Sequence, residues 1–560
     1  MKNRQVDTRG RAAETVMNPR RLGALQPNRL SAARSLYAKM HREHWRIELV
    51  AADIDRVGAG RVLYRIDAGG HVMHVVAFSE EPKMVDRSPR IIGSSWDIVG
   101  ALIDGEVTDE ELEDTRTAIP RLYAGRATPE TLVWFRANRS IRVFDHVVDA
   151  LSAAQQPDLE RIAEVGYLLR NTGLDGNGTF GTKDFQNYGA EHPLATPYYA
   201  QLFTAYMMRE ISLDLVNRIA RVRSADAVEA DERTRGSIAV GNGSALGLVL
   251  LTMNRPQLVN AWLSGYEKLL AGVFERYVTA EVFARVDELL CEAIEFKEQD
   301  STDYGVFPSG EAIAVDLAVV RRLLRKAEQM HAAGIAVTLG EVSRSLPDTV
   351  TPDAQEMFHS LLLELAPVEQ VVEATRSLVV DERKQVDPTA TVAQLSAQIS
   401  QAFAWVSEFP VASREDRSRI WYKSRNSEEP RSGPVAEVPE RTNDLAVDLL
   451  GGVRELQQAL GHAAPTERVG RFVARHPHLG QIVGYVQATA DLPYATPHMD
   501  VRDDRFVPAY IIRLFNAFCY GLDKTRDVHQ RNLRGLIFEN AHFSRDLDLE
   551  PRDWRWAVSA

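Results

Sequence analysis

Apolar and polar positions change their period about a hundred residues into the chain. Between about 45 and 104, apolar residues alternate with polar ones or form short runs, as in 62–66 and 71–78, with the turn Asp67-Ala-Gly-Gly70 between them. Such alternation around a glycine turn predicts antiparallel strands. A further strand is expected over 98–103. The pattern therefore predicts a small antiparallel sheet near the N-terminus.

Beyond this region, apolar positions recur every three or four residues, which predicts helices. Thr108 and Glu111 have capping-box spacing and are expected to open the first long helix after the sheet. Further helices are expected from Thr128-Pro129 to about 151, and over 157–170, 197–223, 312–331 and much of 444–546. The predicted fold class is α+β and predominantly α-helical, with the small N-terminal antiparallel sheet followed by a large helical bundle.

A chain of 560 residues is too long for one ordinary core. Residues 1–30 are rich in arginine and lack periodicity, which predicts a mobile basic arm. The expected division is this arm, a small α+β domain over 31–126, a helical domain over 127–410, a linker rich in proline, serine and charge over 411–440, and a C-terminal helical domain over 441–560.

Three short matches recur in the same order in two places. They pair 165–167 with 483–485, 193–197 with 493–497, and 198–206 with 510–518. One interpretation is an internal duplication, with two related helical units and a site between them. The alternative is chance similarity between helices rich in alanine and leucine.

Charge and cysteine content narrow the function classes. The net charge of −12 argues against a nucleic-acid binder. Only Cys291 and Cys519 are present, which excludes a disulfide scaffold or a CxxC zinc motif and fits a reducing compartment. No apolar run approaches the length of a membrane span and no secretory leader is apparent, so a cytoplasmic protein without a membrane partner is expected.

Polar residues follow the apolar stripe of the helix predicted from Thr128. Asn138, Arg142 and Asp145 lie at i, i+4 and i+7, and Arg139 and His146 lie just beyond. Because an arginine fork can bind a carboxylate or phosphate with two hydrogen bonds, this row is a candidate anion site. A salt-bridge ladder that only fixes helix packing is the alternative.

A glycine-rich loop over 173–184 follows the next predicted helix. Its Gly, Asn and Asp residues suit positive φ angles and close approach of backbone N–H groups to a ligand. Dinucleotide and Walker loops need a preceding strand, so neither is predicted. A plain connection between helices is the alternative. The polar candidates in and beside this loop are Arg170, Asn171, Asn177 and Lys183.

Two later segments supply further candidates. Asn242 and Ser244 stand in a second glycine-rich segment, where they can cap a helix whose N-terminus seats an anion, or merely cap it. Residues 509–520 are apolar nearly all round, yet Arg513, Asn516 and Tyr520 share one stripe. A buried arginine needs a partner, either an anionic ligand or a protein carboxylate; Asp500, Asp503 and Asp504 are the nearest in sequence.

Metal ligands are not expected. His498-Met-Asp500 with His542 has the spacing of a non-haem iron triad, but such triads normally lie on β-barrels and this region is predicted helical. His71 and His74 are three apart on a predicted strand, so they should lie on opposite faces and share no metal.

The expected function is a cytoplasmic enzyme acting on a small anionic metabolite, such as a carboxylate, acyl or phosphate compound. Arg139, Arg142 and Arg513 would hold the anion, and Asp145, His146 or His498 would transfer protons. The site would lie where the 138–146 row, the loop over 173–184 and the helix over 509–520 meet. A non-catalytic helical interaction or regulatory protein is the first alternative, and an oxidoreductase dependent on flavin or non-haem iron is the second. The reaction, the cofactor and homo-oligomer formation stay open.

Overall fold

The structure is a computed structural model of the whole chain. It describes residues 11–81, 96–118, 130–174, 188–189, 191–242, 255–300, 307–378, 385–408, 421–423, 430–432, 449–495, 513–522, 535–549 and 554–556. The chain divides into two compact units. Unit 1 comprises Met1–Gln26, Ser244–Phe515 and Val528–Asn532, and unit 2 comprises Pro27–Gly243, Asn516–Asp527 and Leu533–Ala560.

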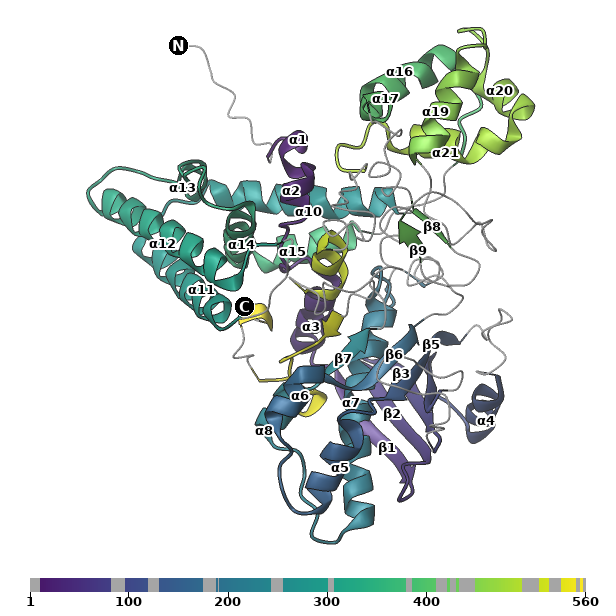
Figure 1. The fold of residues 1–560 in the computed structure, drawn as a ribbon, viewed down its shortest axis with the longest axis vertical. Helices are drawn as coiled ribbons and strands as arrows, with labels where there is room; N and C mark the ends of the chain where they lie inside the picture. The colour runs from purple at the N-terminus through teal and green to yellow at the C-terminus, as the bar shows by residue number, and fades with distance from the viewer. Residues whose placement is uncertain are drawn as a thin grey trace. The chain divides into compact units, whose positions relative to one another are not determined.

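Unit 2 is built on an eight-stranded sheet (Figure 1). In spatial order the strands are β1 (Arg46–Ile54), β2 (Gly60–Ala68), β3 (His71–Ser79), β4 (Ile98–Asp104), β5 (Thr131–Arg139), β6 (Tyr167–Leu174), β7 (Ala239–Asn242) and β10 (Gly535–Ile537). Neighbouring strands are antiparallel except β6 and β7, which are parallel. The sheet therefore takes strands from early, middle and late parts of the chain.

Helix α7 (Tyr199–Arg223) packs against this sheet and contacts most of its strands. Most of its 25 residues are buried, since apolar side chains cover nearly its whole circumference. The other helices of unit 2 are α3 (Ala32–Arg42), α4 (Asp109–Ala118), α5 (Phe144–Ser152), α6 (Leu159–Val165), α8 (Glu232–Gly236), the π-helix η6 (Asn516–Tyr520), and the 3-10 turns η7 (Ser544–Asp546) and η8 (Trp554–Trp556).

The described part of unit 1 is mainly helical. Its helices are α1 (Ala13–Val16), α2 (Pro19–Leu22), α10 (Pro256–Phe274), α11 (Ala280–Gln299), α12 (Gly310–Ala332), α13 (Leu339–Arg344), α14 (Pro352–Leu362), η3 (Leu363–Leu365), α15 (Val368–Arg376), α16 (Val392–Ala402), α17 (Ala404–Glu408), α19 (Leu449–Leu460), α20 (Val469–Arg475), η5 (Pro477–Leu479) and α21 (Gly480–Thr489). Strands β8 (Trp421–Lys423) and β9 (Pro430–Ser432) pair with each other. Threonine and serine side chains cap the starts of α11, α12, α13, α14 and α16. None of the described helices is both long and apolar enough to cross a membrane.

Several predictions hold at this level. The fold is mixed α+β, the strands over 62–66, 71–78 and 98–103 are confirmed, and their sheet is antiparallel. Thr108 and Glu111 exchange the hydrogen bonds of a capping box at the start of α4. The helix predicted over 197–223 is α7. The sheet, however, is larger than the small one predicted.

The first correction concerns the helix predicted from Thr128. Residues Thr131–Arg139 form strand β5, and the helix that follows begins only at Phe144. Val133, Trp134 and Phe135 are all at most 3% exposed, so both faces of β5 are covered. A strand buried on both faces shows no period of two, so its apolar run resembles part of a helical stripe, and the helix predicted here is wrong.

The second correction concerns the helix predicted over 157–170. It ends at Val165, because Gly166 adopts a left-handed conformation with φ of 77°, and strand β6 starts at Tyr167. A strand therefore precedes the glycine-rich loop over 173–184, so a helix before the loop cannot be used to exclude a nucleotide loop. The loop from 175 to 187 lies outside the described residues.

Two further expectations meet a different structure. Within residues 11–30, where the sequence predicts a mobile basic arm, the chain contains α1 and α2 and buries Leu22 and Leu25. In the predicted duplication, Gly166 separates a helix from a strand, whereas Gly484 lies inside α21. The two copies therefore differ in secondary structure at their first match.

Candidate functional site

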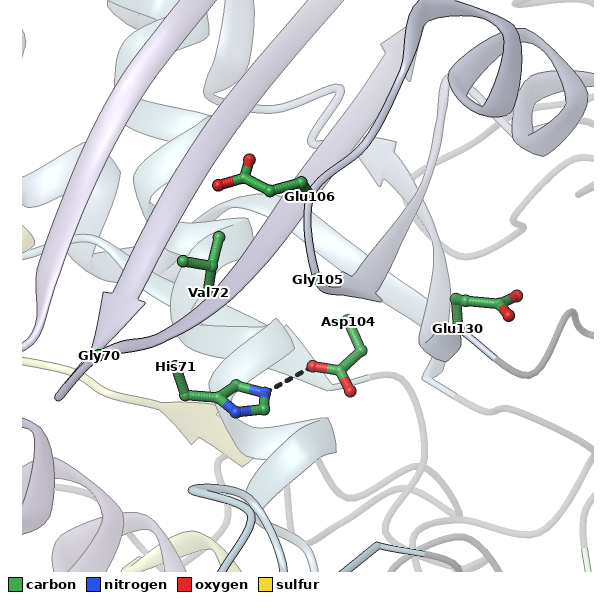
Figure 2. Close-up of a pocket in the computed structure, with 7 residues that line it drawn as sticks. All are labelled: Gly70, His71, Val72, Asp104, Gly105, Glu106 and Glu130. Carbon is green, nitrogen blue, oxygen red and sulfur yellow. Dashed lines mark hydrogen bonds and ion pairs between the residues drawn. The ribbon is translucent and has the colours of Figure 1, made fainter.

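A hollow of about 400 Å³ opens at one end of the sheet in unit 2 (Figure 2). The turn before β3 supplies Gly70, and the start of β3 supplies His71 and Val72. The end of β4 supplies Asp104, and the turn after it supplies Gly105 and Glu106. Glu130, just before β5, completes the lining. The antiparallel register explains this convergence, because the start of β3 lies beside the end of β4.

Asp104 lies between two imidazoles. Its Oδ1 is 2.6 Å from Nε2 of His71 and 3.4 Å from Nε2 of His192, and Figure 2 shows the His71 ring turned toward it. The two rings meet edge to face, with centroids 4.6 Å apart. His192 is 8% exposed whereas His71 is 38% exposed, so His71 is the imidazole that a ligand can reach.

The hydrogen bonds define which nitrogen of His192 carries the proton. The backbone N–H of Leu194 donates to Nδ1 of His192 at 3.0 Å, so Nδ1 is an acceptor and Nε2 holds the hydrogen. Burial lowers the pKa of His192, although the Asp104 carboxylate opposes this shift. His192 is thus a neutral donor to Asp104 above its lowered pKa.

A second histidine lies near the same edge. Nδ1 of His74 is 2.8 Å from the carbonyl oxygen of Gly105, and its Nε2 is 3.6 Å from Glu106. His71 and His74 therefore engage different carboxylates, those of Asp104 and Glu106. The hollow combines one accessible imidazole with three carboxylates, those of Asp104, Glu106 and Glu130.

His71, Asp104 and His192 are also the candidate metal ligands among the described residues, with their donor atoms all within 4.8 Å of one another. Ligation would need a lone pair on both Nε2 atoms. In His192 the Leu194 N–H occupies Nδ1, so a metal on Nε2 would require loss of the Nε2 proton from an imidazole that is already neutral. The arrangement therefore fits acid–base chemistry better than metal binding.

The predicted anion ligand Arg139 is engaged with the protein. Its guanidinium donates to the carbonyl oxygens of Val57 and Gly58 and to Oγ of Ser79, at 2.7 to 2.8 Å. Burial lowers the pKa of Arg139, an effect that nearby carboxylates oppose. Arg139 thus ties the β1–β2 turn to the ends of β3 and β5.

The rest of the predicted row is divided between two elements. Asn138 lies in β5, where its Oδ1 accepts from the N–H of Asp97 at 3.2 Å. Arg142 and Asp145 are exposed around the start of α5. Nδ1 of His146 lies 3.4 Å from Arg161. The prediction that these residues form a row on one continuous helix is therefore wrong.

Strand pairing does bring several predicted residues together. Asn138 lies opposite Arg170 across β5 and β6, and Asn171 lies opposite Asn242 across β6 and β7. Both glycine-rich segments leave the sheet next to these positions. Four predicted residues lie outside the described part of the chain, namely Asn177, Lys183, Ser244 and His498.

The buried Arg513 has a protein partner in unit 1. Its Nη1 donates to Asp353 at 2.5 Å, and its guanidinium lies 4.6 Å from the ring of Phe307. The partner is thus a carboxylate far from Asp500, Asp503 and Asp504 in sequence. In unit 2, Asn516 and Tyr520 are buried in η6, and neither polar atom of the Asn516 amide has a hydrogen-bond partner in the described structure.

Sequence reasoning missed the cluster around Asp104. Its members stand about thirty and ninety residues apart, and no short motif links them. The available signals were local, namely a histidine directly after a Gly-Gly turn and an aspartate directly before the glycine that ends a strand. Only the strand pairing and the 191–195 turn bring them together.

No protein-family model matches this chain, and comparisons with curated proteins and with solved structures give no match either. The structure itself therefore defines the class, an α+β protein with a mixed eight-stranded sheet and a His–Asp–His cluster at one end of it.

Proposed function

We propose that the protein is an enzyme that transfers a proton to or from a small polar substrate held in the hollow. The observation that carries this proposal is the 2.6 Å contact between Nε2 of His71 and Asp104. This contact orients the His71 ring through Nε2. It leaves Nδ1 of the partly exposed imidazole available to a substrate. A base oriented by a third group is the usual arrangement in acid–base catalysis.

Each member of the cluster has a distinct role. His71 is the general base or acid. Asp104 positions the ring and stabilises its charged form after protonation. His192, held neutral by burial and by the Leu194 N–H, is a positioning residue that fixes Asp104 from the other side.

The lining indicates the charge of the substrate. Three carboxylates surround one accessible imidazole, so the field favours a positively charged molecule or one rich in hydrogen-bond donors. A volume of about 400 Å³ suits a small metabolite. The anionic metabolite expected from the sequence is a separate proposal, which now rests on the two glycine-rich segments rather than on Arg139 or Arg513.

Substrate conversion tests this function. The purified protein is incubated with one pool of small amines and one pool of carboxylates and phosphates, and mass spectrometry follows loss of each compound. We expect conversion of a compound in the amine pool, and a loss of at least about 100-fold in rate in His71→Gln and Asp104→Asn.

His44→Gln is the matched control, because His44 is also a histidine beside an aspartate, Asp548, but its side chain is 76% exposed and lies outside the hollow. It should keep the full rate. If His71→Gln and the unmodified protein converted the compound at equal rates, the His71–Asp104–His192 cluster would have no part in the reaction. Conversion confined to the carboxylate and phosphate pool would favour the anionic-metabolite proposal.

A further inference from the structure

Two tryptophans flank one arginine on unit 2. The guanidinium carbon of Arg136 lies 4.8 Å from the ring centroid of Trp96 and 5.5 Å from that of Trp134. Both distances are within the range of cation–π contacts. Arg136 and Trp134 lie on the same face of β5, two residues apart.

Both indole N–H groups are buried without a partner. Nε1 of Trp96 and Nε1 of Trp134 have no hydrogen-bond acceptor among the described atoms, and Trp134 is only 3% exposed. An indole nitrogen can only donate, so no rotation of a hydrogen can satisfy it otherwise. A buried donor left unpaired costs about 1–3 kcal/mol, so each of these two N–H groups calls for an explanation.

Among the described residues, no carboxylate accepts a hydrogen bond from these two indole N–H groups. Trp134 packs among apolar side chains that include Val76, Ala101 and Leu112. The nearest carboxylate in sequence is that of Asp97, which accepts from the backbone N–H of Arg139 at 2.8 Å. In the register of the sheet, Arg136 lies opposite Gly173, where the glycine-rich loop begins.

We infer that Trp96, Trp134 and Arg136 form a binding site for a small oxyanion, either a phosphate or a carboxylate group. The two N–H donors would each direct a hydrogen bond to an anionic oxygen, and the guanidinium would supply the charge. This site differs from the hollow at His71. Trp134 and Arg136 pair with Ala101 and Val99 of β4, whereas Asp104 lies at the end of that strand.

Indole N–H resonances report on this site directly. The protein is labelled with ¹⁵N-tryptophan and titrated with inorganic phosphate, and then with succinate, at constant ionic strength kept with sodium chloride. The chain has 8 tryptophans, and the Trp96→Phe and Trp134→Phe variants assign two of the eight indole signals. We expect these two signals to move downfield and to saturate in the millimolar range, while the other six stay in place.

Matched variants separate binding from folding. Trp→Phe keeps a ring over the guanidinium and removes one N–H donor, so each variant should weaken anion binding about 5- to 10-fold. Arg136→Gln should weaken it more than Arg20→Gln, which changes an exposed arginine. If Trp134→Phe fails to fold, Trp96→Phe and Arg136→Gln still test whether this site binds the anion.

Two outcomes would overturn the proposal. One is the absence of any saturable shift of the Trp96 and Trp134 signals with phosphate and with succinate. The other is an equal shift of all indole signals, which would show only a general effect of salt. A response to phosphate alone or to succinate alone identifies which oxyanion the site selects.

Discussion

Glu210 is a carboxyl group whose charge depends on where the fold has placed it. It lies on α7, where burial raises its pKa to about 7, while the backbone N–H of Ser544 donates to its Oε1 at 2.6 Å and opposes the shift. Because the folded-state pKa lies above that of an unfolded chain, the folded protein binds an additional proton between about pH 4.5 and pH 7. The unfolding free energy therefore falls as pH rises through this range.

We predict that Glu210→Gln flattens this dependence. Glutamine keeps an acceptor for the Ser544 N–H and has no charge to bury. Between pH 5 and pH 8, the unmodified protein should lose about 3 kcal/mol more stability than the variant. Urea unfolding at several pH values measures the difference, and parallel profiles for the two proteins would contradict the assignment.

The sequence was least informative about the roles of individual residues in the site. Arg139 and Arg513 were selected for their charge, but burial and hydrogen-bond partners decide whether a guanidinium faces a ligand. The sequence pairs His71 only with its neighbour His74. Its actual partner, Asp104, follows from the β3–β4 register, which no local pattern records.

At the scale of elements, the sequence predicted those whose signal is local. The β2–β3 hairpin has a glycine turn between alternating strands, and α4 has its capping box. Strands β7 and β10 are only four and three residues long, and they pair across almost three hundred residues of chain. Such strands are stabilised by non-local contacts, so periodicity cannot reveal them.

Gly166 separates helix α6 from strand β6, and its substitution tests this boundary. Its φ of 77° disfavours any side chain, and a Cβ there would lie 2.4 Å from Cδ1 of Leu536 in β10. We predict that Gly166→Ala destabilises the protein by about 2 kcal/mol or more. Gly69→Ala is the control, because φ there is 66° but nothing lies within 4 Å. Equal urea midpoints for the two variants would show that the Leu536 contact contributes nothing.

At the scale of the whole molecule, residues 11–26 are a component of unit 1. Arg11 donates to Glu267 at 2.7 Å and also to Glu356, and Arg21 donates to Glu356 at 2.9 Å. Burial alone would raise the pKa of Glu356, but the Arg11 guanidinium holds it well below its usual range. Arginine count alone suggested a mobile arm, because a sequence does not show which charges find buried partners.

We predict that Arg11→Ala destabilises unit 1 by about 3–5 kcal/mol, since it leaves buried carboxylate charge uncompensated. Arg20→Ala is the control, because Arg20 is exposed in the same segment. Thermal unfolding followed by circular dichroism gives both values. If Arg11→Ala were as stable as Arg20→Ala, the ion pair between Arg21 and Glu356 would by itself be enough to stabilise the buried carboxylate.

Each unit joins segments from distant parts of the chain, and this order has a consequence for synthesis on the ribosome. The sheet of unit 2 starts with β1 but gains its last strand, β10, only after α10 to α21 of unit 1 have been translated. Nascent β7 therefore waits with an unpaired edge, a state prone to wrong pairing. No single cut in the gene yields either unit complete, so expression of separate fragments requires co-expression or permuted chains.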